Sequence, residues 1–494
     1  MRPPSRPLGA LLLLSAMGCG NSAPAPRVDG LDAAMPHDAT AAADATEALL
    51  DGAATPDAPR FDALNDDATR DAGVDRPAPQ DLGAPRDAPG PSDAPAPRDA
   101  PAPTPTRRFW WDSERIDPAA YPDPVWGDGH VHSNFSGDGD HPALAMMNRA
   151  HALGADFVWI TDHAQTPVNN GGISAQEFDQ CSARAREATD DAHFAGCGVE
   201  YRLGYVRPNG SRVYEAWHQV VQNIGADEFG PALNVQGYTS WPQYQRDLAR
   251  TQAWAVITHP SGPTAWFNDD DAAYRDDDPS RHPNTELIEL NGGNDDGGNG
   301  NNQVDGLNAY FRFLNGRWQL SPVWDSDMHR FYPGAEQAKG FGLWVDRRAW
   351  SPARYRATLR ESVRRHVSFA NHPGNQRNWI RVLSLHGDGS PEALMGSTLG
   401  PRESLRLRVR ANLAGNTARW IFRLYTNRND RFDTPARVVG PTGTEVLNGN
   451  VQSWEPTLDT EGLVWAVVYA SPEPGPPGPE TQYLVSAPIW LNNQ

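Results

Sequence analysis

Nine histidine, aspartate and glutamate residues of this chain stand in short patterns that could bind metal ions. The patterns are HVH at 130–132, GDG at 137–139, TDH at 161–163, GVE at 198–200, AWHQVV at 216–221, THP at 258–260 and DSDMH at 325–329. The candidate ligands are His130, His132, Asp138, His163, Glu200, His218, His259, Asp327 and His329. Imidazoles and carboxylates suit Zn²⁺, Mn²⁺ or Fe²⁺. The set therefore predicts a cluster of divalent metal ions and, with it, a hydrolase.

The spacing within two of these patterns favours ligands that act together. His130 and His132 are two residues apart, as are Asp327 and His329, so each pair shares one face of a strand. No cysteine lies in the patterns, which argues against a structural zinc site. Carboxylates can bridge two ions, and a close metal pair can hold a hydroxide that is nucleophilic at neutral pH. A single histidine would more often be an ordinary surface or core residue, but the set as a whole favours metal binding.

The elements that must position these ligands are buried strands alternating with helices. Residues 155–161, 254–258, 285–290 and 320–324 are predicted strands, and 141–153 has the apolar spacing of a helix. This alternation predicts a mostly parallel α/β domain over 107–375. The candidate ligands follow the strands, as sites do at the carboxyl ends of strands in such sheets and barrels.

The predicted secondary structure changes at about residue 376, after which short strands follow one another without long amphipathic helices between them. Residues 379–385, 404–411, 420–426, 463–469 and 483–491 are predicted strands. Leu405, Leu407 and Val409 alternate with arginines, which is the period-two pattern of a half-buried strand. We therefore predict a β-sandwich-like domain over 376–494.

The N-terminus predicts export. Arg2 and Arg6 precede a short apolar stretch at 8–16, too short to span a bilayer, and small residues lead to Cys19. This resembles a bacterial lipoprotein signal over 1–19, cleaved before a lipidated Cys19; an ordinary signal peptide is the alternative. Gly20 follows Cys19, at the position where an aspartate would favour retention in the inner membrane. The prediction is an exported lipoprotein of the cell envelope, in the outer membrane or periplasm and anchored through Cys19.

Residues 20–106 predict a disordered tail rather than a domain. From 21 to 106 the chain holds 15 Asp, one Glu and six Arg, a net charge of −10, with repeated DAP triplets. Such a segment cannot bury enough apolar surface to fold, and we interpret it as an extended tether. The whole chain has a net charge of −19, which argues against general nucleic-acid binding. Cys181 and Cys197 either pair in the exported protein or remain free thiols.

Taken together, the ordered patterns resemble the polymerase and histidinol phosphatase (PHP) superfamily over roughly residues 124–372. The resemblance implies a distorted (β/α)7 barrel with two or three divalent metal ions. A looser similarity, carried by the segment 341–370 and the β-rich C-terminal part, links the chain to an exported branch of carbaryl-type carbamate or ester hydrolases.

The resemblance also implies a role for each candidate ligand. The first metal would be held by His130, His132, Glu200 and Asp327; the second by Glu200, His218 and His259; and the third by Asp138, His163 and His329. Glu200, Asp327 and His329 would serve catalysis as well as binding. Asp162 would assist them by hydrogen bonding a ligand, and Glu289 either faces the site or is structural.

Three functional hypotheses follow from these patterns. The first is a phosphoesterase that acts on a small phosphate ester through a metal-bound hydroxide. The second is a carbamate or carboxylic ester hydrolase on the same metals, and the third is a non-catalytic surface binding module. Phosphate sites usually add arginine or lysine donors; the candidates are Arg202, Arg207, Arg281 and Arg330.

Overall fold

A computed structural model describes most of the chain from residue 114 onward. The described residues are 114–165, 171–206, 212–225, 227–238, 241–260, 284–290, 303–332, 338–372, 377–412, 420–427, 445–447, 451–472 and 483–492. The predicted signal over 1–19 and the predicted tail over 20–106 lie outside these residues. Among the described residues, no helix is both long enough and apolar enough to cross a membrane.

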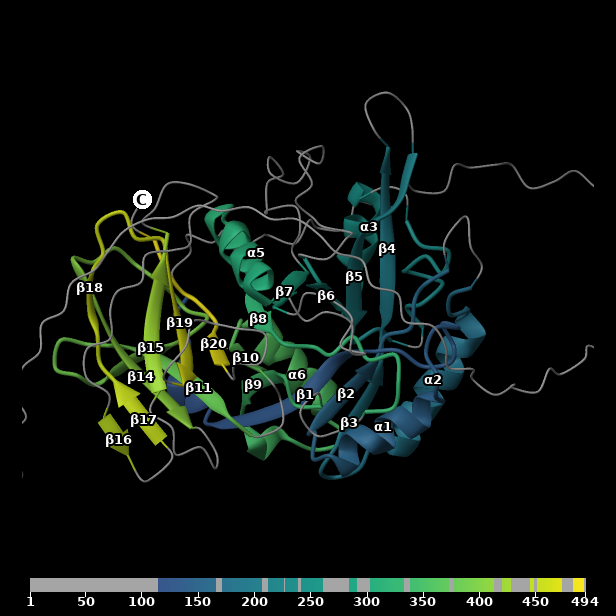
Figure 1. Ribbon diagram of the computed structural model, residues 1–494, viewed down its shortest axis with the longest axis horizontal. Helices are drawn as coiled ribbons and strands as arrows, with labels where there is room; N and C mark the ends of the chain where they lie inside the picture. The colour runs from purple at the N-terminus through teal and green to yellow at the C-terminus, as the bar shows by residue number, and fades with distance from the viewer. Residues whose placement is uncertain are drawn as a thin grey trace, which may run out of the picture. The chain divides into compact units, whose positions relative to one another are not determined.

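The fold is a mixed α/β structure in which strands outnumber helices (Figure 1). The helices are α1 (Ala143–Ala152), α2 (Ala175–Ala188), α3 (Trp241–Leu248), α5 (Gln303–Asn315) and α6 (Tyr355–Arg364), with 3₁₀ turns at Pro118–Ala120 and Arg347–Ala349. The first ten strands are β1 (Asp123–Val131), β2 (Phe157–Ile160), β3 (Phe194–Cys197), β4 (Val199–Val206), β5 (Arg212–Gln222), β6 (Trp254–Ile257), β7 (Thr285–Glu289), β8 (Ser321–Val323), β9 (Phe341–Val345) and β10 (Ser368–His372). The later strands are β11 (Trp379–Leu385), β12 (Pro391–Leu394), β13 (Thr398–Leu399), β14 (Ser404–Asn412), β15 (Trp420–Thr426), β16 (Glu445–Leu447), β17 (Val451–Trp454), β18 (Thr457–Asp459), β19 (Trp465–Pro472), β20 (Tyr483–Ser486) and β21 (Ile489–Leu491).

These strands form three sheets among the described residues. The largest runs in the order β13-β21-β19-β20-β10-β9-β1-β2-β3, with β15 added on β19, and the second is β4-β5-β6-β7-β8. Two isolated bridges join them, Val131 to Met328 and His163 to Glu200. The strand pairings among the described residues do not show the closed barrel that the sequence led us to expect.

The strand directions also differ from the mostly parallel arrangement expected. The β1–β2, β2–β3, β6–β7 and β7–β8 pairs are parallel, but β5 lies antiparallel to both β4 and β6. Only five residues separate β4 from β5, too few for the crossover that parallel neighbours need. The predicted alternation of strands and helices therefore missed the hairpin formed by β4 and β5.

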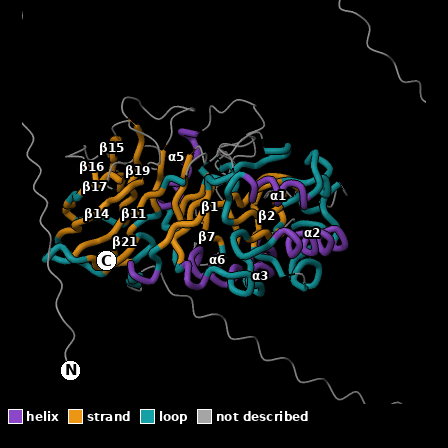
Figure 2. Tube along the Cα trace, turned by 90° about the horizontal axis from the view of Figure 1, so that it is seen from below, coloured by secondary structure: helices purple, strands orange, loops and turns teal. Residues whose placement is uncertain are grey.

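The C-terminal strands build a six-stranded sheet and also extend the large sheet. Strand β14 has the predicted alternation, with Leu405, Leu407 and Val409 fully buried and the arginines that alternate with them half-buried. These side chains share a core with residues of β19, such as Val468. In Figure 2 the strands continue from β14 and β21 to β1, with α6, α1 and α2 beside the β1–β7 part. The large sheet thus crosses the predicted boundary at 375/376, because β10 pairs with β20.

Helix α2 is tied firmly to the strand that leads to Glu200. Ser174 and Glu177 form a reciprocal capping box at its start, which satisfies free N–H groups of the first turn. Cys181, on the buried face of the helix, forms a disulfide with Cys197 at the end of β3. The helix and the disulfide fix the strand only three residues before Glu200.

Candidate metal centre

The structure brings all nine predicted ligands together. His130 lies in β1, His132 directly after it, and His163 shortly after β2. Glu200 and His218 come from β4 and β5, while His259 and the Asp327–His329 pair follow β6 and β8. Residues of both sheets thus converge on one place, although Glu200, at the start of β4, and His218, inside β5, do not follow a strand as expected.

Glu200 lies at the middle of this cluster. One carboxylate oxygen, Oε1, is 2.8 Å from His218 Nδ1 and 3.2 Å from His259 Nε2. The other, Oε2, is 2.8 Å from His163 Nδ1, 3.3 Å from His132 Nε2 and 3.5 Å from His130 Nε2. One carboxylate therefore faces five imidazoles through two oxygens, as expected for a group that bridges metal ions.

Three overlapping groups within the cluster could each hold a metal ion. In each group the ligand atoms lie within 4.8 Å of one another. The groups are His130, His132 and Asp327; Glu200, His218 and His259; and His132, Asp138, His163 and His329. Their division resembles the three sets expected from the sequence, but His132 joins the third group, and Glu200 is absent from the first.

Several buried atoms of the cluster lack hydrogen-bond partners, which fits a metal centre. His163 Nδ1, His218 Nδ1 and Glu200 Oε2 are buried without a hydrogen bond, although the two histidine nitrogens are 2.8 Å from Glu200. Buried polar atoms without partners are costly, so a shared cation is a natural partner for them.

The electrostatics of the cluster favour cations. Burial lowers the pKa of His132, but Asp327 and Glu200 outweigh it and raise the pKa to about 10. The pKa of His130 is likewise held well above its usual value against the effect of burial, by Asp327, Glu289 and Glu200. Burial raises the pKa of Glu200, but the surrounding histidines hold it well below its usual range. The histidines thus favour the ionised form of Glu200, and the carboxylates in turn favour positive charge on His130 and His132.

Exposure shows from which side the site is reached. The side chains of His130 and His132 are fully buried, and Glu200 is 1% exposed. Asp138 is 35% exposed and His329 18%, and His218 is 13% exposed. A substrate would therefore approach over Asp138, His329 and His218.

Two ligands have strained backbones. His259 has φ 26° and Asp327 has φ 51°, in the left-handed region that side chains other than glycine seldom adopt. Both follow a parallel strand, where the chain turns sharply as it leaves the sheet. Such strain often marks a functional site, and here it aims the ligands at the cluster.

Glu289 faces the cluster and holds two of its members. The Nδ1 of His130 lies 2.8 Å from Glu289 Oε1, and the backbone N–H of His259 donates to Oε2 at 2.8 Å. The first contact directs His130 Nε2 toward Asp327 and Glu200. The sequence had left the role of Glu289 open; the structure places it behind two ligands.

Asp162 contacts the ligands through its backbone and through two serines. Its carboxylate accepts hydrogen bonds from Ser133 N and Oγ, both at 2.7 Å, and from Ser136 Oγ at 2.8 Å. Ser136 Oγ is in turn 2.5 Å from Asp138 Oδ1. The Asp162 carboxylate thus reaches a ligand through Ser136, and its backbone carbonyl accepts a hydrogen bond from the N–H of the ligand Glu200 at 3.0 Å.

Two buried carboxyl groups behind His130 were missed from the sequence. Asp128 accepts hydrogen bonds from His130 N, Ser326 and Tyr332, and burial raises its pKa to about 6. Asp325 accepts one from Gly129 N, and burial raises its pKa well above the usual value. Each lies two residues before a ligand. Asp128 shares the β1 face of His130, so the period-two argument could have found it, whereas Asp325 lies beyond the end of β8, where that argument does not apply.

Two of the four arginines considered for phosphate binding lie in the described residues. Arg202 follows Glu200 by two residues in β4, on the same strand face, and pairs in register with His218 of β5. Arg330 follows His329 directly. Arg207 and Arg281 lie outside the described residues.

Comparisons with known proteins leave the family open. No protein-family model matches the sequence, and a search of curated proteins finds no match. Among solved structures, an endo-β-1,4-mannanase from Thermotoga petrophila aligns with 10% identity over 71% of this chain and 70% of its own. Its TM-score is 0.18, which carries no argument about fold or activity.

Proposed function

We propose that the chain is a metal-dependent hydrolase of PHP type, and specifically a phosphoesterase. The observation that carries the proposal is the convergence of the nine candidate ligands, all but Asp138 buried or half-buried, on one cluster with the two oxygens of Glu200 at its middle. Two or three ions of Zn²⁺, Mn²⁺ or Fe²⁺ suit this set of imidazoles and carboxylates. When bound, such ions activate water for attack and stabilise the negative charge that develops on the substrate.

The chain's own residues would prepare the site for this chemistry. Glu289 orients His130 and the backbone of His259, so that neither ligand must rearrange when a substrate binds. Asp162 holds Ser133 and Ser136, and with them the loop that carries Asp138. His329 lies at the exposed edge beside the buried Asp327, where it can orient the substrate and exchange protons with it.

The position of Arg202 favours phosphate over a carbonyl substrate. It is the cross-strand neighbour of His218, on the face of β4 that carries Glu200. A guanidinium group there could bind the equatorial oxygens of a phosphate ester in a bidentate manner. A carbamate or carboxylic ester offers a single carbonyl oxygen and gains less from such a donor, so carbonyl hydrolysis is the second candidate.

The proposal includes the architecture and location expected from the sequence. A distorted (β/α)7 barrel is supported by the bridges Val131–Met328 and His163–Glu200, which join the two sheets at the ends of β1 and β2. Anchoring in the cell envelope through Cys19 rests on the signal-like N-terminus alone. The acidic chain makes a small molecule, and not a nucleic acid, the expected partner.

The test is turnover by the full-length protein loaded with Mn²⁺ or Zn²⁺. Aryl phosphate monoesters and diesters are assayed beside an aryl carbamate and an aryl acetate, with His130→Ala as the inactive control. We expect metal-dependent phosphate release that Arg202→Ala weakens mainly through KM. Cleavage of the carbamate or acetate alone would replace the phosphoesterase by the carbonyl hydrolase. Stoichiometric metal without any turnover would support a binding module.

A further inference from the structure

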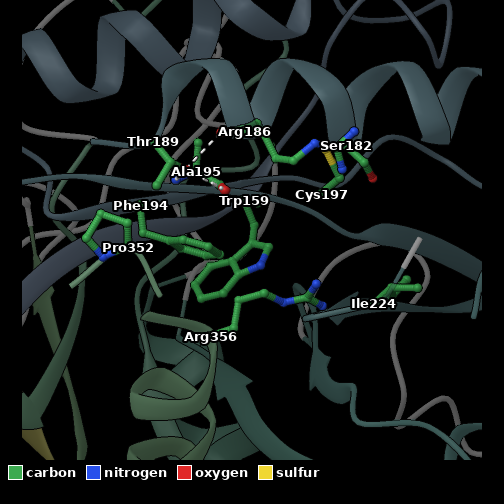
Figure 3. Close-up of a pocket in the computed structure, with 12 residues that line it drawn as sticks. Trp159, Ser182, Arg186, Thr189, Phe194, Ala195, Cys197, Ile224, Pro352 and Arg356 are labelled. Carbon is green, nitrogen blue, oxygen red and sulfur yellow. Dashed lines mark hydrogen bonds between the residues drawn. The ribbon is translucent and has the colours of Figure 1, made fainter. Parts of the chain in front are cut away.

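A cavity of about 420 Å³ lies between α2, β3 and the start of α6, apart from the metal centre (Figure 3). Its two aromatic residues are Trp159, which is fully buried, and Phe194, which is 6% exposed. Neither presents an open ring to a ligand, because they pack against each other and against neighbouring rings. An open aromatic surface lies instead at the exposed side of the metal centre.

That surface is the ring of Phe331. It is the only large hydrophobic side chain that is exposed among the described residues, at 41%. A single exposed aromatic residue is common on protein surfaces and by itself indicates no function. Phe331 differs because it follows His329, an exposed ligand of the cluster, by two residues. Two residues of chain span at most about 7 Å, so Phe331 must lie close to that ligand.

A backbone hydrogen bond joins the segment of Phe331 to the loop that carries Asp138. The N–H of Asp140 donates to the carbonyl of His329 at 2.9 Å. The side chains also meet, since Asp138 Oδ2 lies 3.7 Å from His329 Nε2. His141 follows Asp138 by three residues on the same loop. The two most exposed ligands therefore lie on the same two segments as His141 and Phe331.

Two neighbours hold the ring of Phe331 in place. The guanidinium carbon of Arg149 lies 5.5 Å from the ring centroid, and the same guanidinium donates to the carbonyl of Tyr332 at 3.3 and 3.4 Å. The imidazole of His141 packs against the ring at an angle of 61° and a centroid distance of 4.9 Å. A ring fixed in this way loses little conformational freedom when a ligand binds, which favours its use as a binding surface.

We propose that Phe331, with His141 beside it, binds the leaving group of the substrate, and that this leaving group is planar and aromatic. The inference rests on the proposed phosphoesterase, because the phosphate must lie at the metal cluster for its substituent to reach Phe331. Aromatic rings pack against one another in offset or edge-to-face arrangements that a non-planar aliphatic ring cannot adopt. The substrate class is therefore an aryl or arylmethyl phosphate ester.

The experiment is calorimetric titration of the full-length protein, loaded with Mn²⁺, with two phosphonates that cannot be hydrolysed. Benzylphosphonate carries a planar ring, and cyclohexylmethylphosphonate carries a ring of similar size that is not planar. We expect the wild type to bind benzylphosphonate about fivefold more tightly than the cyclohexyl compound, and Phe331→Ala to abolish that preference.

Phe331→Tyr is the matched control, because it keeps the planar ring at the same position. Its Kd for benzylphosphonate should stay within about twofold of the wild type, whereas Phe331→Ala should raise that Kd about tenfold. Both substitutions are made at an exposed side chain, so the fold should tolerate them.

Three outcomes would overturn the aromatic surface and leave the phosphoesterase standing. The wild type could bind both phosphonates equally, Phe331→Ala could keep the preference for the planar ring, or Phe331→Tyr could lose binding as Phe331→Ala does. In each case a phosphonate still binds at the metals. If neither compound binds the metal-loaded wild type, the result counts against the phosphoesterase itself, and the inference that rests on it falls too.

Discussion

Replacing Glu289 by Gln tests whether the residue behind the ligands controls metal binding. Glu289 offers two carboxylate oxygens to two donors, His130 Nδ1 and His259 N, each at 2.8 Å, and is fully buried. Glutamine keeps the shape but has one oxygen and one NH2 group. One of the two donors therefore meets another donor and loses its hydrogen bond.

The magnitude follows from that single lost contact. Leaving a buried donor unpaired costs about 1–3 kcal/mol, which corresponds to roughly 5- to 150-fold in an equilibrium constant. Changes to groups that orient metal ligands typically weaken binding about 10- to 100-fold. We therefore expect Glu289→Gln to lower the metal affinity about 10- to 100-fold, and to lower turnover even at saturating metal.

Metal affinity is measured by titrating metal-free protein with Mn²⁺ or Zn²⁺ in competition with a chelating dye. Glu286→Gln is the matched control, because Glu286 lies on β7 three residues earlier and so faces the other side of the strand. Its carboxylate pairs with His366 Nε2 at 3.2 Å, away from the cluster. A Glu289→Gln variant whose metal affinity stays within about twofold of the wild type would refute the reasoning.

Four further predictions concern the metals, the disulfide and a buried histidine. His130→Ala should abolish metal-dependent turnover at saturating metal, while circular dichroism still reports a folded chain. Removing metal with EDTA should lower Tm, because a ligand present at a concentration of about 100 times its Kd adds about 2.7 kcal/mol to the free energy of unfolding. An unchanged Tm would argue against metal bound at the centre. The Cys181–Cys197 disulfide spans a separation of 16 residues, so replacing both by Ala should lower the free energy of unfolding by about 3 kcal/mol in urea titrations. Burial lowers the pKa of His193 from 6.5 to about 4. Between pH 6.5 and 4, His193 binds a proton in the unfolded chain but not in the folded one, so the free energy of unfolding should fall as the pH drops through this range. His193→Gln should make the free energy of unfolding less dependent on pH there.

The sequence predicted individual elements best where a buried strand had clear boundaries. Residues 254–258 and 285–290 were expected as strands and are β6 and β7 almost to the residue. The antiparallel course of β5 was not foreseen, because neighbouring directions depend on the connection between strands and not on the strands themselves. For the same reason, the link between β10 and β20 across residue 375 could not be read from local composition.

The identity of the candidate ligands was determined by the sequence alone. Histidines and carboxylates stood in local patterns after apolar runs, and a period of two placed His130 with His132 on one face; Asp327 and His329 instead follow β8 outside any strand, with Asp327 at φ 51°. Only the tertiary structure decided which groups meet. It set Glu289 against His130, 159 residues away. Local spacing fixes which side chains leave a strand end together, whereas contacts between distant segments depend on how the sheets pair and pack.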